Sequence, residues 1–426
     1  MKYCKRCLYP ENHPLGICID EDGICSGCRV HEEKDEIDWA GKGKELEDLF
    51  STYRDRPGSF YDCVIHVTGN SDSFFIVDLV KNQYGLNPLL VTYNTQFNTK
   101  VGVRNLARLL SNLDCDHMML TISPDIAKKV TKIAMHKLGD MYWHVLAGSQ
   151  TFPVQVATKF KIPLVIWGVN GWLDQVGMFS HYDRVEMTNK VRKEHVLRTM
   201  DVDELFDGEE QLSWKDKQPF TYPSDAQLEK SRVRGIYLGN FIRWDAQKQS
   251  EEMIEKYGYE AMEQPRTFNN YESIYCWNNA GTHDYVKFLK FGYGKATDHA
   301  TRDIRLKRLS REEGIGLAEK FDAEVPDVSL LLFLEWIDMT KEEFYETLEV
   351  FRDPLVWKKT KNGEYIRIDN IANHISDSNV GNARLKINDP KKYFHSVLLE
   401  MEDENQGYIL MGRGYIDEIN YKAIKG

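Results

Sequence analysis

The sequence has no long uninterrupted run of apolar residues. The longest, around residues 329–334, stops at Glu335 and is much shorter than the roughly 20 residues of a membrane-spanning helix. The charged start, MKYCKRC, is not followed by the apolar segment that marks a secretory signal. We therefore expect a protein that does not span a membrane and that resides in the cytoplasm.

An excess of basic residues is also missing. The chain of 426 residues has 55 Lys and Arg against 66 Asp and Glu, a net charge of -11. Nucleic-acid-binding proteins usually present a basic field, so nucleic acid is an unlikely partner. A P-loop, a GxGxxG fingerprint and an HExxH motif are absent as well. The length and a hydrophobic content of 42% are typical of a globular protein with two or three domains.

Cysteine is scarce except at the start, where five of the eight cysteines lie within 28 residues. Four of them form the pattern Cys4-x2-Cys7-x17-Cys25-x2-Cys28. Each CxxC turns two thiolates toward one metal, and two such pairs complete a tetrahedral site, so we predict a structural zinc. The alternatives are four unrelated thiols or a redox pair, which needs only one CxxC at a strand-to-helix turn.

Short apolar segments alternate with helical patterns through the middle of the chain. The expected strands are residues 63–67, 89–93, 118–122, 164–167 and 236–238, and the expected helices between them are 73–82, 101–110, 126–138 and 142–160. This alternation predicts an α/β fold, a doubly wound parallel sheet covered on both faces. Ligands of such sheets bind at the carboxyl ends of the strands.

Three segments follow from these patterns. We expect a zinc-ribbon module over residues 1–45, the α/β domain over 55–245 and a mainly helical region over 246–426. The charged run of residues 31–36 is interpreted as a solvated connector. The sequence NNAGT at residues 278–282 is typical of a turn.

The first strand is followed by the sequence HVTGNSDSFF, residues 66–75. Backbone N–H groups of such a turn, and of the helix that follows, bind phosphate oxygens without a lysine. Hydroxyls of Ser71 and Ser73 add donors, and Asp72 can hold Mg²⁺. The stretch resembles the S-G-G-x-D-S loop of the PP-loop ATP pyrophosphatases, which cleave ATP between the α and β phosphates while adenylating a carbonyl or carboxylate.

The loop departs from that signature in two places, and it also lacks a lysine that relatives often carry. Thr68 replaces the first serine and keeps its hydroxyl. Asn70 replaces the second glycine and brings a Cβ and an amide where glycine permits a positive φ. Ser71 stands where relatives often carry lysine. A turn and helix N-cap without a ligand is the alternative interpretation.

Together the three segments resemble the N-acetyl sugar amidotransferases of bacterial surface-glycan (lipopolysaccharide) biosynthesis. The resemblance rests on the start YCKRCLYPENHP, on the loop, and on FGYGKATDHA at residues 291–300 with Arg302 and Arg305 behind it. It covers most of the chain to about residue 315 and implies an ATP-dependent amidotransferase. ATP would adenylate the acetamido or carboxyl group of a nucleotide-linked N-acetyl sugar, and ammonia would displace AMP.

The resemblance also implies roles for individual residues. Thr68, Gly69, Asn70, Ser71, Asp72 and Ser73 would cradle the phosphates of ATP, with Asp72 on Mg²⁺. Tyr93 and Asn94 would lie beside the adenine, opposite Gly168 and Asn170. Lys295, Arg302 and Arg305 would clamp pyrophosphate, while Asp298 and His299 orient the substrate or carry protons. The catalytic residues would be Asp72, Ser73, Lys295, Asp298 and His299. A solvated basic helix is the alternative for residues 295–305.

The chain offers no glutaminase of its own. Lys2, not a cysteine, follows Met1, and the motif GICSG at residues 23–27 has no strand ahead of it and uses Cys25. The resemblance therefore implies separate glutaminase and cyclase-like subunits that deliver ammonia. Two alternatives stay open: a non-catalytic nucleotide- or sugar-binding subunit with a degenerate loop, and a tRNA sulfurtransferase, which would need a basic RNA-binding face.

Overall fold

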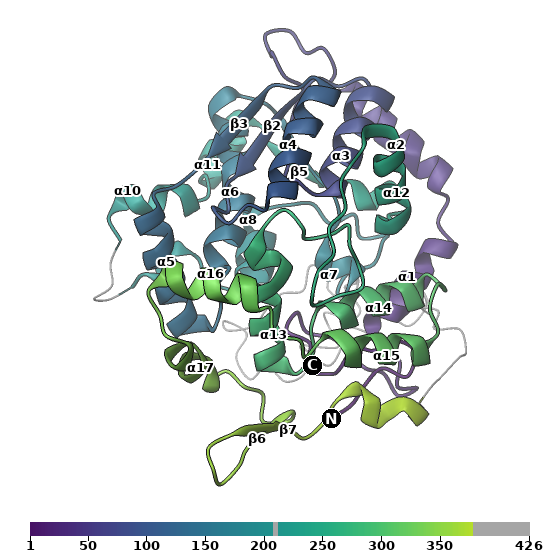
Figure 1. The fold of residues 1–426 in the computed structure, drawn as a ribbon. Helices are drawn as coiled ribbons and strands as arrows, with labels where there is room; N and C mark the ends of the chain where they lie inside the picture. Colours follow the sequence, from purple (N-terminus) through teal and green to yellow (C-terminus); the bar gives the residue numbers. More distant parts are fainter. Residues whose placement is uncertain (208–211, 378–426) are drawn as a thin grey trace, which may run out of the picture.

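A five-stranded parallel sheet forms the centre of the fold in the computed structural model, which describes residues 1–207 and 212–377 (Figure 1). The strand order is β3-β2-β1-β4-β5, with every neighbouring pair parallel. The strands are β1 (Cys63–His66), β2 (Pro88–Tyr93), β3 (His117–Leu120), β4 (Leu164–Trp167) and β5 (Arg234–Tyr237). The predicted parallel α/β sheet is confirmed.

Helices cover both faces of this sheet. On one face lie α2 (Trp39–Ser51), α3 (Ser71–Val77), α4 (Lys100–Leu113) and α12 (Ala246–Tyr257). They pack over Ile65 and Leu90, whereas Val64 and Val91 point to the opposite face and pack with α6 (Trp143–Phe160). Successive strand side chains alternate between faces, so burial on both sides requires the nearly continuous apolar strands of this sequence.

Further helices and turns complete the sheet domain. They are α5 (Pro124–Leu138), α7 (Gly171–Asp174), α8 (Asn189–Val191), α9 (Val202–Leu205), α10 (Trp214–Lys217), α11 (Asp225–Ser231), and the 3-10 or π turns η2 (Asp78–Gln83), η3 (Arg192–Val196), η4 (Gln218–Phe220) and η5 (Leu238–Asn240). Among these, α7 matters for the site, because it begins directly after β4 at the carboxyl edge of the sheet.

The C-terminal region is helical as far as it is described. Its elements are η6 (Asn278–Thr282), α13 (His283–Phe291), α14 (Lys295–Arg305), α15 (Arg311–Phe321), α16 (Asp327–Ile337), α17 (Lys341–Glu349), the antiparallel hairpin β6 (Trp357–Lys359) and β7 (Tyr365–Arg367), and η7 (Ile371–Asp377). Residues 378–426 of the expected region lie outside the described residues. Helix α12, assigned to this region by the sequence, packs against α3 instead.

The N-terminal module brings its four cysteines together. The Sγ atoms of Cys4, Cys7, Cys25 and Cys28 all lie within 4.8 Å of one another, and all four residues are buried. The helix α1 (Ser26–His31) and the turn η1 (Glu32–Asp35) lead from this cluster toward α2. The predicted four-cysteine module is therefore present at the N-terminus.

The interpretation of residues 31–36 as a solvated connector is wrong. Glu33 is 3% exposed and accepts hydrogen bonds from the Ser180 hydroxyl (2.7 Å) and the His181 N–H (2.9 Å). Lys34, also 3% exposed, forms an ion pair of 2.5 Å with Asp174. A charge can leave water where it gains such partners, and here the partners belong to the segment that follows β4.

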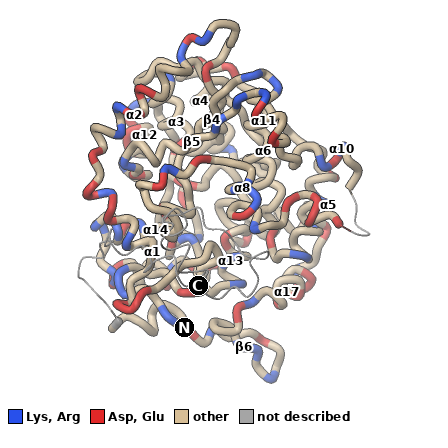
Figure 2. The backbone as a smooth tube through the Cα atoms, turned by 180° about the vertical axis from the view of Figure 1, so that it is seen from behind, with Lys and Arg blue, Asp and Glu red and all other residues tan. Residues whose placement is uncertain are grey.

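Charged residues of both signs are interspersed over the face shown in Figure 2. No helix within the described ranges, 1–207 and 212–377, is long and apolar enough to cross a membrane.

The loop after β1 is packed backbone to backbone. A Cβ on Gly69 would lie 2.2 Å from the carbonyl oxygen of Gly102 at the start of α4, and a Cβ on Gly102 would lie 2.5 to 2.9 Å from backbone atoms of Tyr275. Glycine is thus required at both positions for close approach rather than for an unusual φ. These contacts fix the loop after β1 against the start of α4, and they fix α4 against the segment around Tyr275 that leads into η6.

We expect Gly102→Ala to destabilise the protein by about 2 kcal/mol or more, because overpacking against backbone outweighs the gain in helix propensity of about 1 kcal/mol. The matched control is Gly316→Ala in α15, where a Cβ has nothing within 4 Å and should stabilise by about 0.5–1 kcal/mol. Urea unfolding of both variants measures the difference. Equal free energies of unfolding for Gly102→Ala and the unsubstituted chain would contradict the packing argument.

Candidate active site

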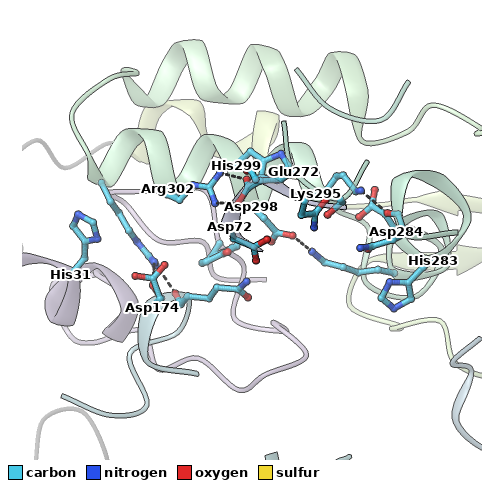
Figure 3. Close-up of a pocket in the computed structure, with 18 residues that line it drawn as sticks. His31, Asp72, Asp174, Glu272, His283, Asp284, Lys295, Asp298, His299 and Arg302 are labelled. Atoms are coloured by element: carbon cyan, nitrogen blue, oxygen red, sulfur yellow. Dashed lines mark hydrogen bonds and ion pairs between the residues drawn. The ribbon is translucent and has the colours of Figure 1, made fainter. Parts of the chain in front are cut away.

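A polar cavity of about 430 Å³ lies at the carboxyl edge of the sheet (Figure 3). The strand order reverses between β1 and β4, and such a switch point is where open α/β sheets bind ligands. Residues 70–72 after β1, residues 174–175 after β4 and α14 line the cavity. The structure thus brings the loop and the expected basic helix to one site, together with Tyr9 and His31 of the N-terminal module.

The loop after β1 is closed by its own hydroxyl groups. The Ser73 Oγ accepts from the Thr68 N–H (2.9 Å), and the Thr68 Oγ1 accepts from the Asn70 N–H (3.2 Å). Asn70 caps α3 with an extended backbone, φ -93° and ψ 159°. The positive φ that glycine would permit at this position is not used, so asparagine fits without backbone strain. Its Oδ1 atom is buried and has no hydrogen-bond partner among residues 1–207 and 212–377.

Two serines of the loop already have partners. Ser71, at the position where relatives carry lysine, is 3% exposed, and its hydroxyl lies 2.7 Å from that of Ser250 in α12. Ser73 is equally buried and holds the loop closed. Both serines therefore shape the loop, and a phosphate would have to compete for their hydroxyls.

Asp72 differs from the other carboxylates of the cavity. Asp174, Glu272, Asp284 and Asp298 each form an ion pair with a basic side chain. In the described part of the chain, Asp72 has no basic side chain within ion-pair distance and is open to the cavity. The enclosing walls of the cavity and the nearby charge of Glu272 raise the pKa of Asp72 to about 6, although its side chain is exposed to the cavity. Such a carboxylate is suited to a cation.

Lys295 is the corresponding basic group. Its Nζ donates to the carbonyl oxygen of Asn279 (2.6 Å) and lies 3.5 Å from the Gln264 Oε1. Neither partner is charged, and no carboxylate among the described residues lies within ion-pair distance of it. Burial lowers the pKa of Lys295 to about 8. The cavity therefore holds one acid and one base whose charges are not neutralised by a neighbour.

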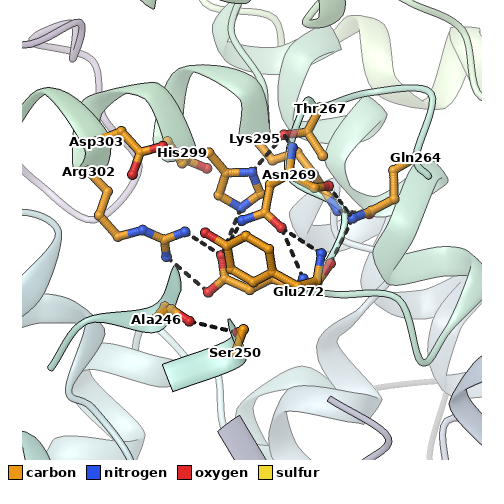
Figure 4. A network of polar contacts seen from close by, with 12 residues as sticks. Ala246, Ser250, Gln264, Thr267, Asn269, Glu272, Lys295, His299, Arg302 and Asp303 are labelled. Atoms are coloured by element: carbon orange, nitrogen blue, oxygen red, sulfur yellow. Dashed lines mark hydrogen bonds and ion pairs between the residues drawn. The ribbon is translucent and has the colours of Figure 1, made fainter. Parts of the chain in front are cut away.

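Arg302 and His299 belong to a tight network around Glu272 (Figure 4). Glu272 accepts from both guanidinium nitrogens of Arg302, one at 2.9 Å, and lies 3.4 Å from the His299 Nε2. Although burial opposes ionisation, the positive charge of Arg302 lowers the pKa of Glu272 to about 2. The other ring nitrogen of His299 lies 2.7 Å from the Thr267 hydroxyl, and burial lowers the pKa of His299 to about 3. His299 is therefore neutral and holds Glu272 in place.

Arg305 also lines the cavity, but its guanidinium already has partners. Its Nη1 donates to the carbonyl oxygens of Asp174 (3.0 Å) and Gln175 (2.8 Å), while Nε and Nη2 approach sulfur atoms of the cysteine cluster. The expected role of Arg305 as a pyrophosphate clamp stays a prediction, and a pyrophosphate would have to compete for donors that already have acceptors. Asp298 is held by Lys287 at 2.5 Å, and its Oδ1 is buried without a hydrogen-bond partner among the described residues.

The four residues expected beside the adenine do not line the cavity. Tyr93 is 1% exposed and packs against His144 and α6. The Asn94 side chain accepts hydrogen bonds within its own loop and donates one to the Thr121 hydroxyl after β3, and Gly168 packs against Trp244 and Ile76. Asn170 caps α7 through Oδ1 (3.0 Å), while its buried Nδ2 has no hydrogen-bond partner in the described part of the chain.

Several lining residues were not predicted from the sequence. Asp174, Glu272, Asp284 and Lys287 carry charge into the cavity, while Tyr9, His31 and His283 contribute rings. The segment NNAGT, expected to be a turn, is the π-helical η6, whose Asn279 carbonyl holds Lys295. The sequence around an acidic residue does not show whether it lines a cavity, because the basic residue that pairs with it lies far away in the sequence.

The cysteine cluster fits a zinc ion on its own chemistry. Backbone N–H groups of Arg6, Cys7 and Cys25 lie 3.2 to 3.4 Å from the Cys4 Sγ, the geometry expected for thiolate acceptors. Four buried cysteine sulfurs within 4.8 Å leave no position for a substrate. The zinc would be structural, held by Cys4, Cys7, Cys25 and Cys28.

Comparisons with known proteins give a family match and three similar proteins. Residues 251–371 match the model described as "LPS biosynthesis protein WbpG-like, C-terminal domain". The uncharacterized protein MJ1599 of Methanocaldococcus jannaschii is 24% identical over 117 residues, which are 28% of this chain and 42% of that protein. The chain thus spans less than half of that relative. Its C-terminal part is similar to that of WbpG-like LPS biosynthesis proteins.

Two solved structures are also similar to this chain. They are the NMN synthetase from Francisella tularensis, with 13% identity and a TM-score of 0.27, and the NH3-dependent NAD synthetase from Campylobacter jejuni, with 14% identity and a TM-score of 0.28. In each case the alignment covers 52% of this chain and 96% of the other.

We expect Glu272→Gln to destabilise the protein by about 2 kcal/mol, because it leaves the largely buried guanidinium of Arg302 without its counter-charge. The control is Glu260→Gln, which removes ion pairs to Arg104 and Arg108 on the surface and should cost less than about 1 kcal/mol. Urea unfolding at pH 7 measures both. Equal losses in the two variants would show that the network around Glu272 is not a buried ion pair in energetic terms.

Proposed function

We propose that this chain is an ATP-dependent amidotransferase of surface-glycan biosynthesis. It would adenylate the acetamido or carboxyl group of a nucleotide-linked N-acetyl sugar and replace AMP with ammonia. The match of residues 251–371 to the C-terminal domain of LPS biosynthesis proteins supports the pathway. The reaction is inferred from the resemblance of the loop after β1 and from the charges of the cavity.

The observation that carries the proposal is the pair of uncompensated charges, Asp72 and Lys295, on one cavity at the switch point of the sheet. Cleavage of ATP between the α and β phosphates requires a divalent cation and neutralisation of the departing pyrophosphate. Asp72 would hold Mg²⁺, and Lys295 would bind the pyrophosphate oxygens. Arg302, neutralised by Glu272, would add a donor but little net charge.

Unpartnered polar atoms support a ligand beside the strand ends. Within the described ranges, the His66 Nε2, the Trp167 Nε1 and the Asn170 Nδ2 are buried without a hydrogen-bond partner at the carboxyl ends of β1 and β4. Buried polar atoms of native proteins are normally paired. We propose that the nucleoside of ATP lies on this side of the loop, with the triphosphate over residues 68–73.

The reaction would proceed in two steps, adenylation and displacement of AMP by ammonia. An oxygen of the acetamido or carboxyl group attacks the α phosphorus, the bond to the bridging oxygen breaks, and pyrophosphate leaves. Ammonia then adds to the activated carbon, loses a proton, and AMP departs with the transferred oxygen. Asp298, whose Oδ1 has no hydrogen-bond partner, would orient the sugar. Ammonia would come from glutaminase and cyclase-like partner subunits.

We expect pyrophosphate and AMP to appear when ATP, Mg²⁺, ammonium and an N-acetyl sugar nucleotide are supplied together. Asp72→Asn should lower the rate by about 100-fold or more, because it removes the carboxylate that holds the cation. The control is Asp225→Asn, an acid in the first turn of α11 that does not line the cavity. Nucleotide products are resolved by chromatography.

The same assay separates the alternatives. ADP instead of AMP would contradict adenylation. If ATP binds but is not cleaved with any of the sugar nucleotides tested, the non-catalytic interpretation of the loop is favoured. Thiolated tRNA as product would favour a sulfurtransferase.

We expect kcat/KM to fall above about pH 8, because kcat/KM follows the ionisation of the free enzyme and Lys295 loses its proton there. Lys295→Arg should move the pH at which kcat/KM falls well above 8, since arginine stays protonated. The control is Lys290→Arg. Burial also lowers the pKa of Lys290 to about 8, but its ammonium bonds the carbonyls of Leu138 and Gly139. If the fall in kcat/KM moves to higher pH only in Lys290→Arg, the assignment of this fall to Lys295 is contradicted.

A further inference from the structure

The side chain of Arg305 lies where three segments meet. It extends from the C-terminal end of α14 between the cysteine cluster and the segment that follows α7. Its Nε lies 3.4 Å from the Cys28 Sγ and its Nη2 3.5 Å from the Cys25 Sγ. Its Nη1 donates to the last carbonyls of α7, on Asp174 and Gln175. All three nitrogens of the guanidinium are therefore engaged.

The guanidinium of Arg305 fits beside the second CxxC pair because residue 27 is a glycine. A Cβ on Gly27, between the two cysteines of the second knuckle, would lie 2.3 Å from the Arg305 Nη2 and 2.2 Å from the carbonyl oxygen of Gln175. Any larger residue would push the arginine or the α7 segment away. The ring of Tyr9 lies 5.3 Å from the Arg305 guanidinium carbon and completes the enclosure.

Charge explains why a cation is required here. Four thiolates around one Zn²⁺ carry two excess negative charges, and all four cysteines are buried. Backbone N–H groups supply partial compensation, and Arg305 supplies a full positive charge. The guanidinium also satisfies carbonyls that the end of α7 leaves without helical partners.

We infer that Arg305 couples the four-cysteine metal site to the ligand cavity, so that metal binding and the position of the α7 segment depend on each other. The cavity is lined by Asp174 and Gln175, whose carbonyls Arg305 holds, and by Tyr9 and His31 of the metal module. Arg305 is thus a positioning residue. It acts through the cysteine sulfurs and the α7 carbonyls and does not touch the reacting groups.

The inference predicts two effects of Arg305→Met that need no substrate and no turnover. Zinc affinity, measured by competition with a chromophoric chelator, should fall about 10- to 100-fold, as when other partners of metal ligands are removed. In the full chain with saturating zinc, hydrogen exchange of residues 171–177 should rise at least tenfold, while exchange in the strands stays unchanged. Failure of the proposed amidotransfer would leave both readouts intact.

The control is Arg308→Met, one turn away on the chain and paired with Asp245 at the surface; it should change neither readout. Gly27→Ala keeps Arg305 and all four cysteines but fills the space of the guanidinium, and should reproduce both effects. If Arg305→Met does not fold, Arg305→Lys replaces it. Lysine keeps the charge but lacks the fork, so exchange of residues 171–177 should rise more than zinc affinity falls. Unchanged zinc affinity and unchanged exchange in the Arg305 variant and in Gly27→Ala would overturn the inference.

Discussion

A charged side chain that leaves bulk water needs an opposite charge or hydrogen bonds within reach. At the carboxyl edge of this sheet the partner usually comes from another segment of the chain. Lys34 of the N-terminal module pairs with Asp174 behind β4, and Arg302 of α14 pairs with Glu272 ahead of η6. Breaking such a pair leaves an uncompensated charge, so the pairs hold the walls of the cavity at fixed positions.

The sheet could be predicted because its signal is local. Strands buried on both faces appear in the sequence as continuous apolar runs, and β4 begins and ends at the predicted residues. The spacing of two CxxC pairs likewise contains nearly all the geometry of the cysteine cluster. The loop after β1 follows from its position between a strand and a helix. In each case, a few neighbouring residues carry the information.

The rest of the site depends on contacts that no local pattern reports. Arg302 and Arg305 are three residues apart and share a helix face, yet one binds Glu272 and the other reaches Cys25 and Cys28. A charged run has the same composition whether it is solvated or docked, so Glu33 and Lys34 could not be distinguished from a connector. For Asn70, the loop signature could not tell whether the glycine that it replaces served a positive φ, and the backbone here is extended.

The loop lacks the lysine that relatives often carry, and a residue from another segment brings a positive charge to the cavity. Ser71 lines the cavity, but it carries no charge and its hydroxyl lies 2.7 Å from that of Ser250 in α12. The uncompensated positive charge of the cavity is Lys295, which the C-terminal region contributes from α14. Under the proposed function, the positive charge that the loop lacks would therefore come from α14. Since α14 is joined to the cysteine cluster and to α7 through Arg305, the three segments of the chain must assemble before the cavity has a basic group to offer a phosphate.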